Sequence, residues 1–263
     1  MSSPRIFTPE YYALMRELER GGWWNAAMRD IAGRLLEGIA LPASGVLLDV
    51  GCGGGQTMTW FGARHPSWRT VGIDVSRDAV AAANGLRPGQ VAQASALELP
   101  FPSGSVDGIV AIDVLQHLSL DHGDERALAE MARVLKARGF LFVRTNAQAF
   151  PRVADDPAAA FHRYEAAELR AKLQRSGFVV HRMGRLNALL GLAEIPRELR
   201  ARRADGSRYH GLMAVVRREP RWLFSLKRNW LNFEGRLAAR GALLPAGRTL
   251  VALCELSERE RTA

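Results

Sequence analysis

Two aspartates and a group of glycines are the residues whose types and spacing point most directly to chemistry. An apolar run at 46–50 that includes Asp49 gives way to a glycine at every second position: Gly51, Gly53 and Gly55. Such glycines let the main chain turn tightly and approach a ligand without clashes from Cβ atoms. Another apolar run, at 70–73, ends in Asp74, and an acid that closes the second strand of an open parallel sheet can accept hydrogen bonds from ribose hydroxyls. The spacing therefore predicts that the chain binds an adenosine-containing molecule.

The glycine loop lacks the features of two common phosphate-binding loops. The dinucleotide fingerprint places Gly or Ala three residues after its second glycine, where this chain has Gln56. The Gly-Lys-Ser/Thr ending of the nucleoside triphosphate loop is absent as well. Asp49 would be a poor neighbour for a pyrophosphate and a good one for an ammonium group. The loop therefore favours an adenosine ligand that ends in an amino acid.

The pattern Asp-x-Gly-x-Gly-x-Gly resembles the S-adenosylmethionine (SAM) loop of class I methyltransferases. The resemblance covers roughly residues 45–185, and the chain is most similar to small-molecule methyltransferases related to the quinone-biosynthesis enzymes. The segment 95–102 resembles the part that wraps the adenine, with Ser95 where the family usually carries Asp. The segment 105–118 resembles the fourth strand with its acceptor-side loop. The resemblance implies that SAM is the cofactor and S-adenosylhomocysteine its product.

The same resemblance implies a set of cofactor contacts. They are Asp49, Gly51, Cys52, Gly53, Gly55, Asp74, Val75, Ser95, Ala96, Leu97, Ile112 and Asp113. The glycine loop would receive the methionine end of SAM, Asp74 the ribose, and residues 95–97 the adenine. For Asp113 an alternative stays open, because an acid after a strand also favours a turn.

His117 is the candidate for chemistry, since it follows the predicted fourth strand and should stand at the carboxyl edge of the sheet. Methyl transfer from a sulfonium depends mostly on alignment, and a base is needed only to take a proton from the acceptor. An imidazole suits that task at neutral pH. Alternatively, His117 is a loop residue that forms only local hydrogen bonds.

Two aromatic groups are candidates for the acceptor site. Trp23 and Trp24 either roof the pocket as a lid or anchor the first helices to the sheet. The segment His162, Arg163 and Tyr164 either folds over the acceptor or serves helix entry and packing. The remaining histidines form no i, i+4 pair, so no metal site is predicted: His65, His122, His181 and His210.

Alternating helix and strand patterns predict an α/β fold, a doubly wound Rossmann-like sheet of seven strands. The predicted strands lie near 46–50, 70–74, 91–94, 106–112, 140–144, 178–182 and 249–256. The predicted helices lie near 8–38, 56–64, 77–84, 123–136 and 165–175, and Gly177 caps the last. We expect an N-terminal helical cap at 1–40, a SAM-binding core at 41–185, a basic insertion at 186–247, and a last strand with its tail at 248–263.

The predicted insertion carries the excess of positive charge. Residues 1–180 contain 19 basic and 19 acidic residues, whereas residues 181–263 contain 17 and 8, a net charge of +9. Three interpretations stay open: a solvated arginine-rich face, a site for a phosphate- or carboxylate-bearing acceptor, or contact with nucleic acid or an anionic membrane. In the last case the basic side chains would flank an apolar helical stripe: Trp222, Leu226, Trp230, Phe233 and Leu237.

Composition fits a globular enzyme, with 263 residues, 48% hydrophobic and 24% charged. The absence of a long apolar stretch or signal peptide, and two cysteines without metal-ligand spacing, predict a cytoplasmic protein without disulfides. We expect a SAM-dependent methyltransferase acting on a small molecule. The alternatives are an RNA methyltransferase, which no added RNA-binding motif supports, and a catalytically inactive SAM-fold scaffold.

Overall fold

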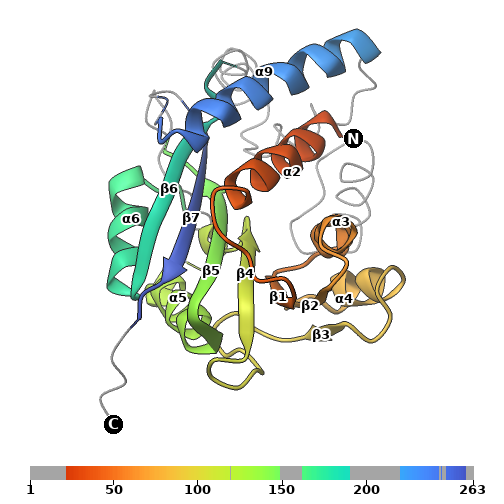
Figure 1. Ribbon diagram of the computed structural model, residues 1–263, viewed down its shortest axis with the longest axis vertical. Coiled ribbons are helices and arrows are strands. Elements are labelled where there is room, and N and C mark those ends of the chain that lie inside the picture. The colour runs from red at the N-terminus through yellow and green to blue at the C-terminus, as the bar shows by residue number, and fades with distance from the viewer. Residues whose placement is uncertain are drawn as a thin grey trace, which may run out of the picture.

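A seven-stranded mixed sheet forms the centre of the protein, in the order β3-β2-β1-β4-β5-β7-β6 (Figure 1). The computed structural model describes residues 22–118, 120–148, 162–189, 220–242, 244 and 247–258. The strands are β1 (Gly45–Val50), β2 (Trp68–Asp74), β3 (Val91–Gln93), β4 (Val106–Ile112), β5 (Leu135–Asn146), β6 (Phe178–Leu186) and β7 (Thr249–Leu256). This is the predicted α/β fold. All seven predicted strands are present.

The sheet is parallel from β3 to β5, and β7 runs antiparallel to both β5 and β6. The chain order reverses between β1 and β4, which pair directly. In open α/β sheets this switch point is where ligands bind, beyond the carboxyl ends of the strands. The glycine loop after β1 and the turn after β4 therefore meet at the edge of the sheet where a ligand is expected.

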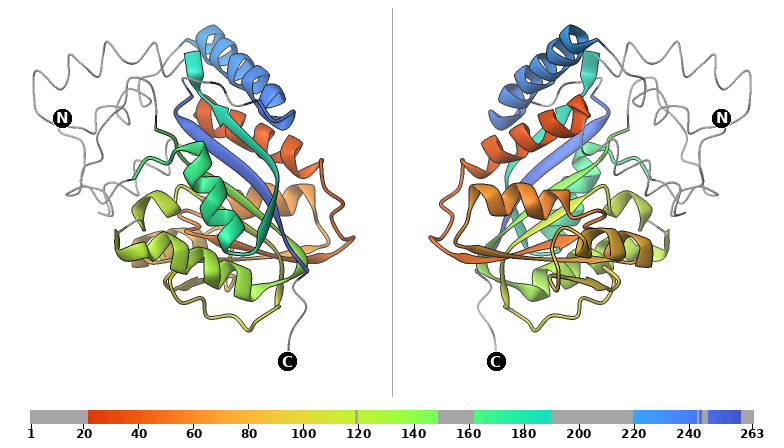
Figure 2. Two further views of the ribbon diagram at one scale, coloured as in Figure 1. Left: turned by 90° about the vertical axis from the view of Figure 1, so that its left-hand side faces the viewer. Right: turned by 90° about the vertical axis from the view of Figure 1, so that its right-hand side faces the viewer.

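Helices cover both faces of the sheet (Figures 1 and 2). They are α2 (Trp23–Leu36), α3 (Gln56–Arg64), α4 (Arg77–Asn84), α5 (Gly123–Val134), α6 (Ala166–Arg175) and α9 (Arg221–Ala239), with short 3-10 turns η1 (Leu115–His117) and η2 (Leu120–His122). Alternate residues of the strands pack on opposite faces. Leu48 and Ile109 contribute to the cluster beneath α5 and α6, whereas Leu47 and Val110 contribute to the cluster beneath α2 and α9.

Strand β5 starts earlier than predicted. The helix expected to run to residue 136 ends at Val134, and residues 136–139, which precede the strand predicted to start at 140, form a bulge inside β5. The register shifts there from the pair of Val106 with Leu135 to the pair of Gly108 with Phe140. Arg138 adopts a left-handed backbone with φ of 62°. A salt bridge from Lys136 Nζ to Asp107 Oδ1 at 2.8 Å joins the bulge to β4, and no local pattern in the sequence predicts this pair.

The described part of the predicted insertion joins the sheet through α9, which lies beside α2 (Figure 1). Asp30 of α2 accepts hydrogen bonds from Arg228 at 2.8 Å and Asn232 at 3.1 Å. Burial alone would raise the pKa of Asp30, but these hydrogen bonds outweigh burial and hold that pKa below its ordinary value. The helices also approach closely, because a Cβ at Gly235 would lie 2.4 Å from Ile31 Cγ1. The boundaries of the cap and of the insertion stay predictions.

Two further expectations concern the cysteines and the membrane. Cys52 and Cys254 are both buried and free, and burial raises the pKa of the Cys254 thiol to about 12. Within the described residues, none of the helices combines the length and the apolar character needed to cross a bilayer. The same residues hold no group of three or more side chains suited to a metal ion.

Candidate functional site

The glycine loop after β1 has the backbone geometry that its sequence predicts. Gly51, Gly53 and Gly55 have φ angles of 70°, 51° and 78°, in the left-handed region that side chains other than glycine rarely adopt. A Cβ at Gly51 would also lie 2.4 Å from Val114 Cγ2, in the turn after β4. Glycine at this position therefore allows the loops after β1 and β4 to pack together.

Backbone hydrogen bonds hold the start of this loop against the end of β2. The N–H groups of Gly51 and Cys52 both donate to the carbonyl of Ile73, at 2.8 and 2.9 Å. The Cys52 side chain is buried in a small cluster with Met58 and Ala83. We therefore expect Cys52 to serve the site through its backbone rather than through its thiol.

Asp74 stands at the end of β2, beside the loop. Its Oδ2 accepts from the N–H of Gly53 and its Oδ1 from the N–H of Ser76, both at 2.9 Å. Burial raises the pKa of Asp74 above its ordinary value, although hydrogen bonds from Ser76 and Gly53 oppose that rise. A carboxylate accepts more than one hydrogen bond per oxygen, so both oxygens keep capacity for ligand hydroxyls.

The first turn of α3 provides hydrogen-bond donors, whereas Asp74 provides acceptors. The helix begins after Gly55, and no side chain caps its N-terminus. The first N–H groups of a helix have no partner within the helix, and the helix dipole makes that end positive. This end of α3 can therefore receive a carboxylate next to the glycine loop.

The segment predicted to hold the adenine lies beside Asp74. The N–H of Ala94 donates to the backbone carbonyl of Asp74 at 3.1 Å, and the Ser95 hydroxyl accepts from the N–H of Leu97 at 3.2 Å. Val75, which follows Asp74, has 64% of its surface exposed. An exposed apolar side chain at this position can pack against the flat face of a base.

The end of β4 carries an ion pair that the sequence reading missed. Asp113 adopts a left-handed backbone with φ of 57°. Its carboxylate accepts from Nε and Nη2 of Arg144, and its N–H donates to the Arg144 carbonyl at 2.8 Å. Arg144 pairs in register with Ile112 on the neighbouring strand. Nothing in either segment signals the pairing, because it depends on β4 and β5 being adjacent.

His117 ends η1 and is half-buried at the same edge of the sheet. Its Nε2 lies 3.5 Å from Nε2 of Gln116, whose Oε1 accepts from the N–H of Asn146 at 3.1 Å. The N–H of His162 donates to the carbonyl of Gln116 at 2.8 Å. The fold therefore brings His162 next to the segment that carries His117, and a side-chain contact at 3.0 Å links His162 Nε2 to Glu168 Oε1.

Two predicted acceptor contacts lie in packed positions. Tyr164 has no exposed surface, and its hydroxyl donates to Asp124 Oδ2 at 2.8 Å. This position fits the packing alternative for Tyr164 and not direct contact with an acceptor. Trp23 is buried with its ring beneath Lys227 Nζ, 5.4 Å from the ring centre, which fits the anchoring alternative. Trp24 meets Trp23 edge-on and stays half-buried.

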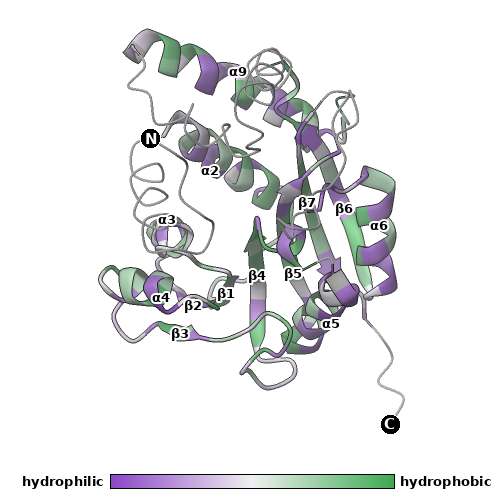
Figure 3. Cartoon of the chain, turned by 180° about the vertical axis from the view of Figure 1, so that it is seen from behind, coloured by the Kyte–Doolittle hydropathy of each residue, from purple (hydrophilic) through white to green (hydrophobic). Residues whose placement is uncertain are grey.

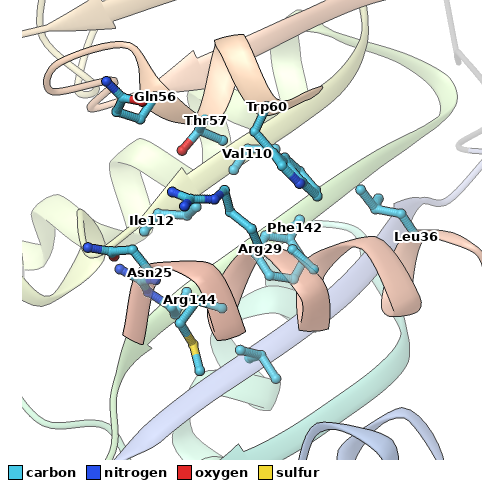
Figure 4. A pocket seen from close by; sticks show the side chains of 13 residues that line it. Asn25, Arg29, Leu36, Gln56, Thr57, Trp60, Val110, Ile112, Phe142 and Arg144 are labelled. Carbon is cyan, nitrogen blue, oxygen red and sulfur yellow. The ribbon is translucent and has the colours of Figure 1, made fainter. Parts of the chain in front are cut away.

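A pocket with a cavity volume of about 60 Å³ lies between α2, α3 and the sheet (Figure 4). It is lined by Asn25, Met28, Arg29, Ala32, Leu36, Gln56, Thr57, Trp60, Val110, Ile112, Phe142, Arg144 and Val251. The lining contains two arginines and no acid. Figure 4 shows Arg29 extending across the pocket from α2 toward α3. Of these residues only Ile112 was predicted, because Asn25 and Arg29 sit on a helix whose position the sequence does not fix.

A family model described as a methyltransferase domain matches residues 48–143, from the middle of β1 into β5. This segment carries the glycine loop, Asp74 and the β4 turn, in the geometry described above. The chain contains a methyltransferase domain. As the resemblance implied, the matched family is that of a methyltransferase domain, and curated relatives of this chain include SAM-dependent methyltransferases.

Curated relatives differ in the acceptors that their names state. The chain is 35% identical to a probable SAM-dependent methyltransferase of Mycobacterium tuberculosis, over 51% of this chain and 48% of the relative. It is 32% identical to a tRNA (carboxymethyluridine(34)-5-O)-methyltransferase of Arabidopsis thaliana, over 40% and 24%. It is 38% identical to an O-methyltransferase of Aspergillus sclerotiorum, over 34% and 35%. The chain thus spans about half, or less, of the length of these relatives.

Solved structures extend the likeness to most of the chain. The [4+2]-cyclase SpnF matches with a TM-score of 0.61 at 20% identity, covering 98% of each chain. Geranyl diphosphate C-methyltransferase from Streptomyces coelicolor matches with a TM-score of 0.58 at 17% identity, covering 94% of this chain and 83% of that one. At these identities the likeness establishes a shared fold and leaves the acceptor of the methyltransferase domain open.

Proposed function

We propose that the protein transfers the methyl group of SAM to an O, N or C atom of a small-molecule acceptor. The observation that carries the proposal is the clamp at the end of β2, where Asp74 is held by the N–H groups of Gly53 and Ser76. This clamp fixes an acid beside a glycine loop. That arrangement matches a ligand with a ribose at one end and an amino acid at the other.

The residues around the clamp suit the parts of SAM one by one. The uncapped start of α3 suits the carboxylate of the methionine end, and Asp49 suits its ammonium group. Asp74 would accept hydrogen bonds from the ribose hydroxyls. The adenine would lie between the exposed side chain of Val75 and the turn at 95–97.

When bound, SAM supplies a methyl group on a positively charged sulfur, which makes the methyl group electrophilic. The protein then has to align the acceptor and, where the acceptor carries a proton, remove it. We assign the second task to His117, at the carboxyl edge of β4. Arg144 holds Asp113 in its left-handed conformation and so shapes the wall on which the two ligands meet.

The pocket beneath α2 supports an anionic acceptor. Arg29 lines it, and a planar guanidinium grips a carboxylate or phosphate through paired hydrogen bonds, whereas the guanidinium of Arg144 is already paired with Asp113. A volume of about 60 Å³ admits one such group rather than a whole metabolite. We infer that the pocket receives the charged end of the acceptor. The densest group of arginines in the predicted insertion lies outside the described residues: Arg197, Arg200, Arg202 and Arg203.

A tRNA acceptor is the second candidate, favoured by the Arabidopsis relative and by the net charge of the last third of the chain. Label from radioactive SAM would be followed into a small-molecule extract and into total tRNA. The small-molecule proposal expects label in the extract alone. Label in tRNA would overturn it, and failure of the protein to bind SAM by calorimetric titration would end both proposals.

Replacing Arg29 by glutamine should raise the Michaelis constant of the acceptor about tenfold or more, because one charge-assisted contact would be lost. The Kd for SAM should change little. Arg34→Gln is the matched control, since Arg34 lies on the same helix and is exposed. The effect is measured by steady-state kinetics with radioactive SAM, in which the concentration of the acceptor that takes up the label is varied. Equal Michaelis constants for the two variants would remove Arg29 from the acceptor site.

A further inference from the structure

Helix α9 exposes a line of large apolar side chains to solvent. Trp222, Leu226, Trp230 and Phe233 keep 67%, 59%, 36% and 45% of their surface exposed. Their spacing of four, four and three residues puts them on one face of the helix. From Trp222 to Phe233, a distance of 11 residue steps, the line extends about 17 Å along the helix axis. A contiguous apolar patch on a soluble domain marks an interaction site.

The opposite face of α9 is already used. Leu231 and Ala238 are fully buried, and a Cβ at Gly184 of β6 would lie 2.2 Å from Ala238 Cβ. On the side of α9 that faces α2, Arg228 forms a salt bridge with Asp30 at 2.8 Å. These contacts fix the rotation of the helix. The apolar line therefore cannot turn inward without breaking the packing on α2 and β6.

The exposed charges among the described side chains of α9 are basic. The helix and its C-cap carry five basic residues: Arg221, Lys227, Arg228, Arg236 and Arg240. Of these, Arg236 and Arg240 are exposed, whereas Lys227 packs over Trp23 and Arg228 pairs with Asp30. The acid of the helix, Glu234, is 1% exposed. Its carboxylate accepts from Trp230 Nε1 at 2.8 Å and from the N–H of Ala188 at 3.1 Å. The exposed surface of α9 is therefore apolar and basic, without an exposed acid among its described side chains. Figure 3 shows hydrophobic and hydrophilic residues alternating along this helix.

We propose that α9 docks the protein on an anionic lipid bilayer, lying parallel to its surface. Tryptophan, phenylalanine and leucine on one face and basic residues beside them are the composition of interfacial helices. Tryptophan sits at the headgroup level of a bilayer, and basic residues are attracted to anionic headgroups. An unbroken line that includes Leu226 favours an acyl surface over RNA, whose affinity comes mainly from phosphate contacts.

The docked helix would also place the pocket near the lipid surface. Helix α9 packs on α2, and α2 carries Asn25 and Arg29 of the pocket lining. If the proposed function holds, acceptors with an apolar tail and an anionic end could reach the pocket from the bilayer. Docking itself requires neither SAM nor an acceptor, so it can be tested separately.

Co-sedimentation of the full chain with vesicles tests the proposal. Vesicles of phosphatidylcholine with one quarter phosphatidylglycerol should bind the protein, and pure phosphatidylcholine should bind it several-fold more weakly. The double variant Trp222→Ser/Leu226→Ser should bind at least about tenfold more weakly than the parent, because it loses two apolar contacts with the acyl region. Arg236→Gln/Arg240→Gln should lose the preference for the anionic vesicles, and the parent should lose it at high salt.

The matched control is Leu86→Ser/Val179→Ser, which removes two exposed apolar side chains away from α9 and should leave vesicle binding within twofold of the parent. Calorimetric titration with SAM then shows that each variant keeps its folded site, whatever becomes of the proposed acceptor. Three results would overturn the proposal. The first is that the parent fails to bind anionic vesicles, and the second is that the control variant loses as much vesicle binding as the Trp222→Ser/Leu226→Ser variant. The third result is that the protein binds RNA or a second copy of itself through Trp222 and does not bind vesicles.

Discussion

Replacing His117 by alanine should lower turnover about 10² to 10⁴-fold, while the Kd for SAM changes little. The expectation follows from the position of His117 at the end of η1, where it is half-buried after β4. This is the edge of the sheet at which we propose that the methyl group is presented. A residue that acts only on the acceptor affects the chemical step and leaves cofactor binding intact. Single-turnover label transfer and calorimetry measure the two quantities separately.

His122→Ala is the control for this prediction. The His122 side chain is 85% exposed at the start of α5, five residues further along the chain. The His122→Ala substitution should lower turnover less than twofold. If His117→Ala also stayed within a few-fold of the parent, alignment alone would account for catalysis. His117 would then be a loop residue that forms local hydrogen bonds.

Replacing Asp74 by alanine should weaken SAM binding by about 2 to 3 kcal/mol, which corresponds to roughly 30- to 150-fold in Kd. The side chain would lose its charge-assisted hydrogen bonds to the ribose, and the N–H of Gly53 would lose its partner in the loop. Calorimetric titration gives the Kd directly. Asp78→Ala, at an exposed position in the first turn of α4, should leave it within a few-fold. Equal affinity of parent and Asp74→Ala would exclude Asp74 from the site.

The pH dependence of SAM binding gives an independent check on Asp74. Burial raises the pKa of Asp74 above 3.8, so the folded protein binds this proton more tightly than the unfolded chain does. The charged form therefore costs stability above the raised pKa, and that cost disappears as pH falls through it. Ribose hydroxyls need the charged form as acceptor, so the affinity for SAM should fall over the same range. Asp74→Asn should bind SAM weakly and lose this dependence on pH.

Most of the fold could be predicted from patterns among residues that are close together in the sequence. Strands β1 and β4 are buried on both faces and have nearly continuous apolar sequences, and Gly51, Gly53 and Gly55 of the loop adopt left-handed backbone. Asp74 was proposed as a ligand contact for the same reason, since it closes an apolar run within one βα unit. These features depend on residues a few positions apart. Local sequence is sufficient to specify them.

Features that join distant segments could not be predicted in this way. The Asp113–Arg144 pair, the arginines of the pocket and the burial of Tyr164 each require that two segments far apart in sequence become neighbours. The early start of β5 was not predicted, because Leu135 joins the strand through its pairing with Val106 of β4.

Helix α9 shows the division within one element. Its sequence alone predicted an apolar stripe flanked by basic residues, because spacing along a helix defines its faces. Which face is buried was decided by tertiary packing. The helix carries a second apolar face, with Leu231 and Ala238, and that face fits against α2 and β6. Hydrophobicity alone does not distinguish the two apolar faces of α9. The face with Leu231 is the one that is buried, because its small residues allow close packing: Gly235 approaches Ile31 of α2, and Ala238 approaches Gly184 of β6.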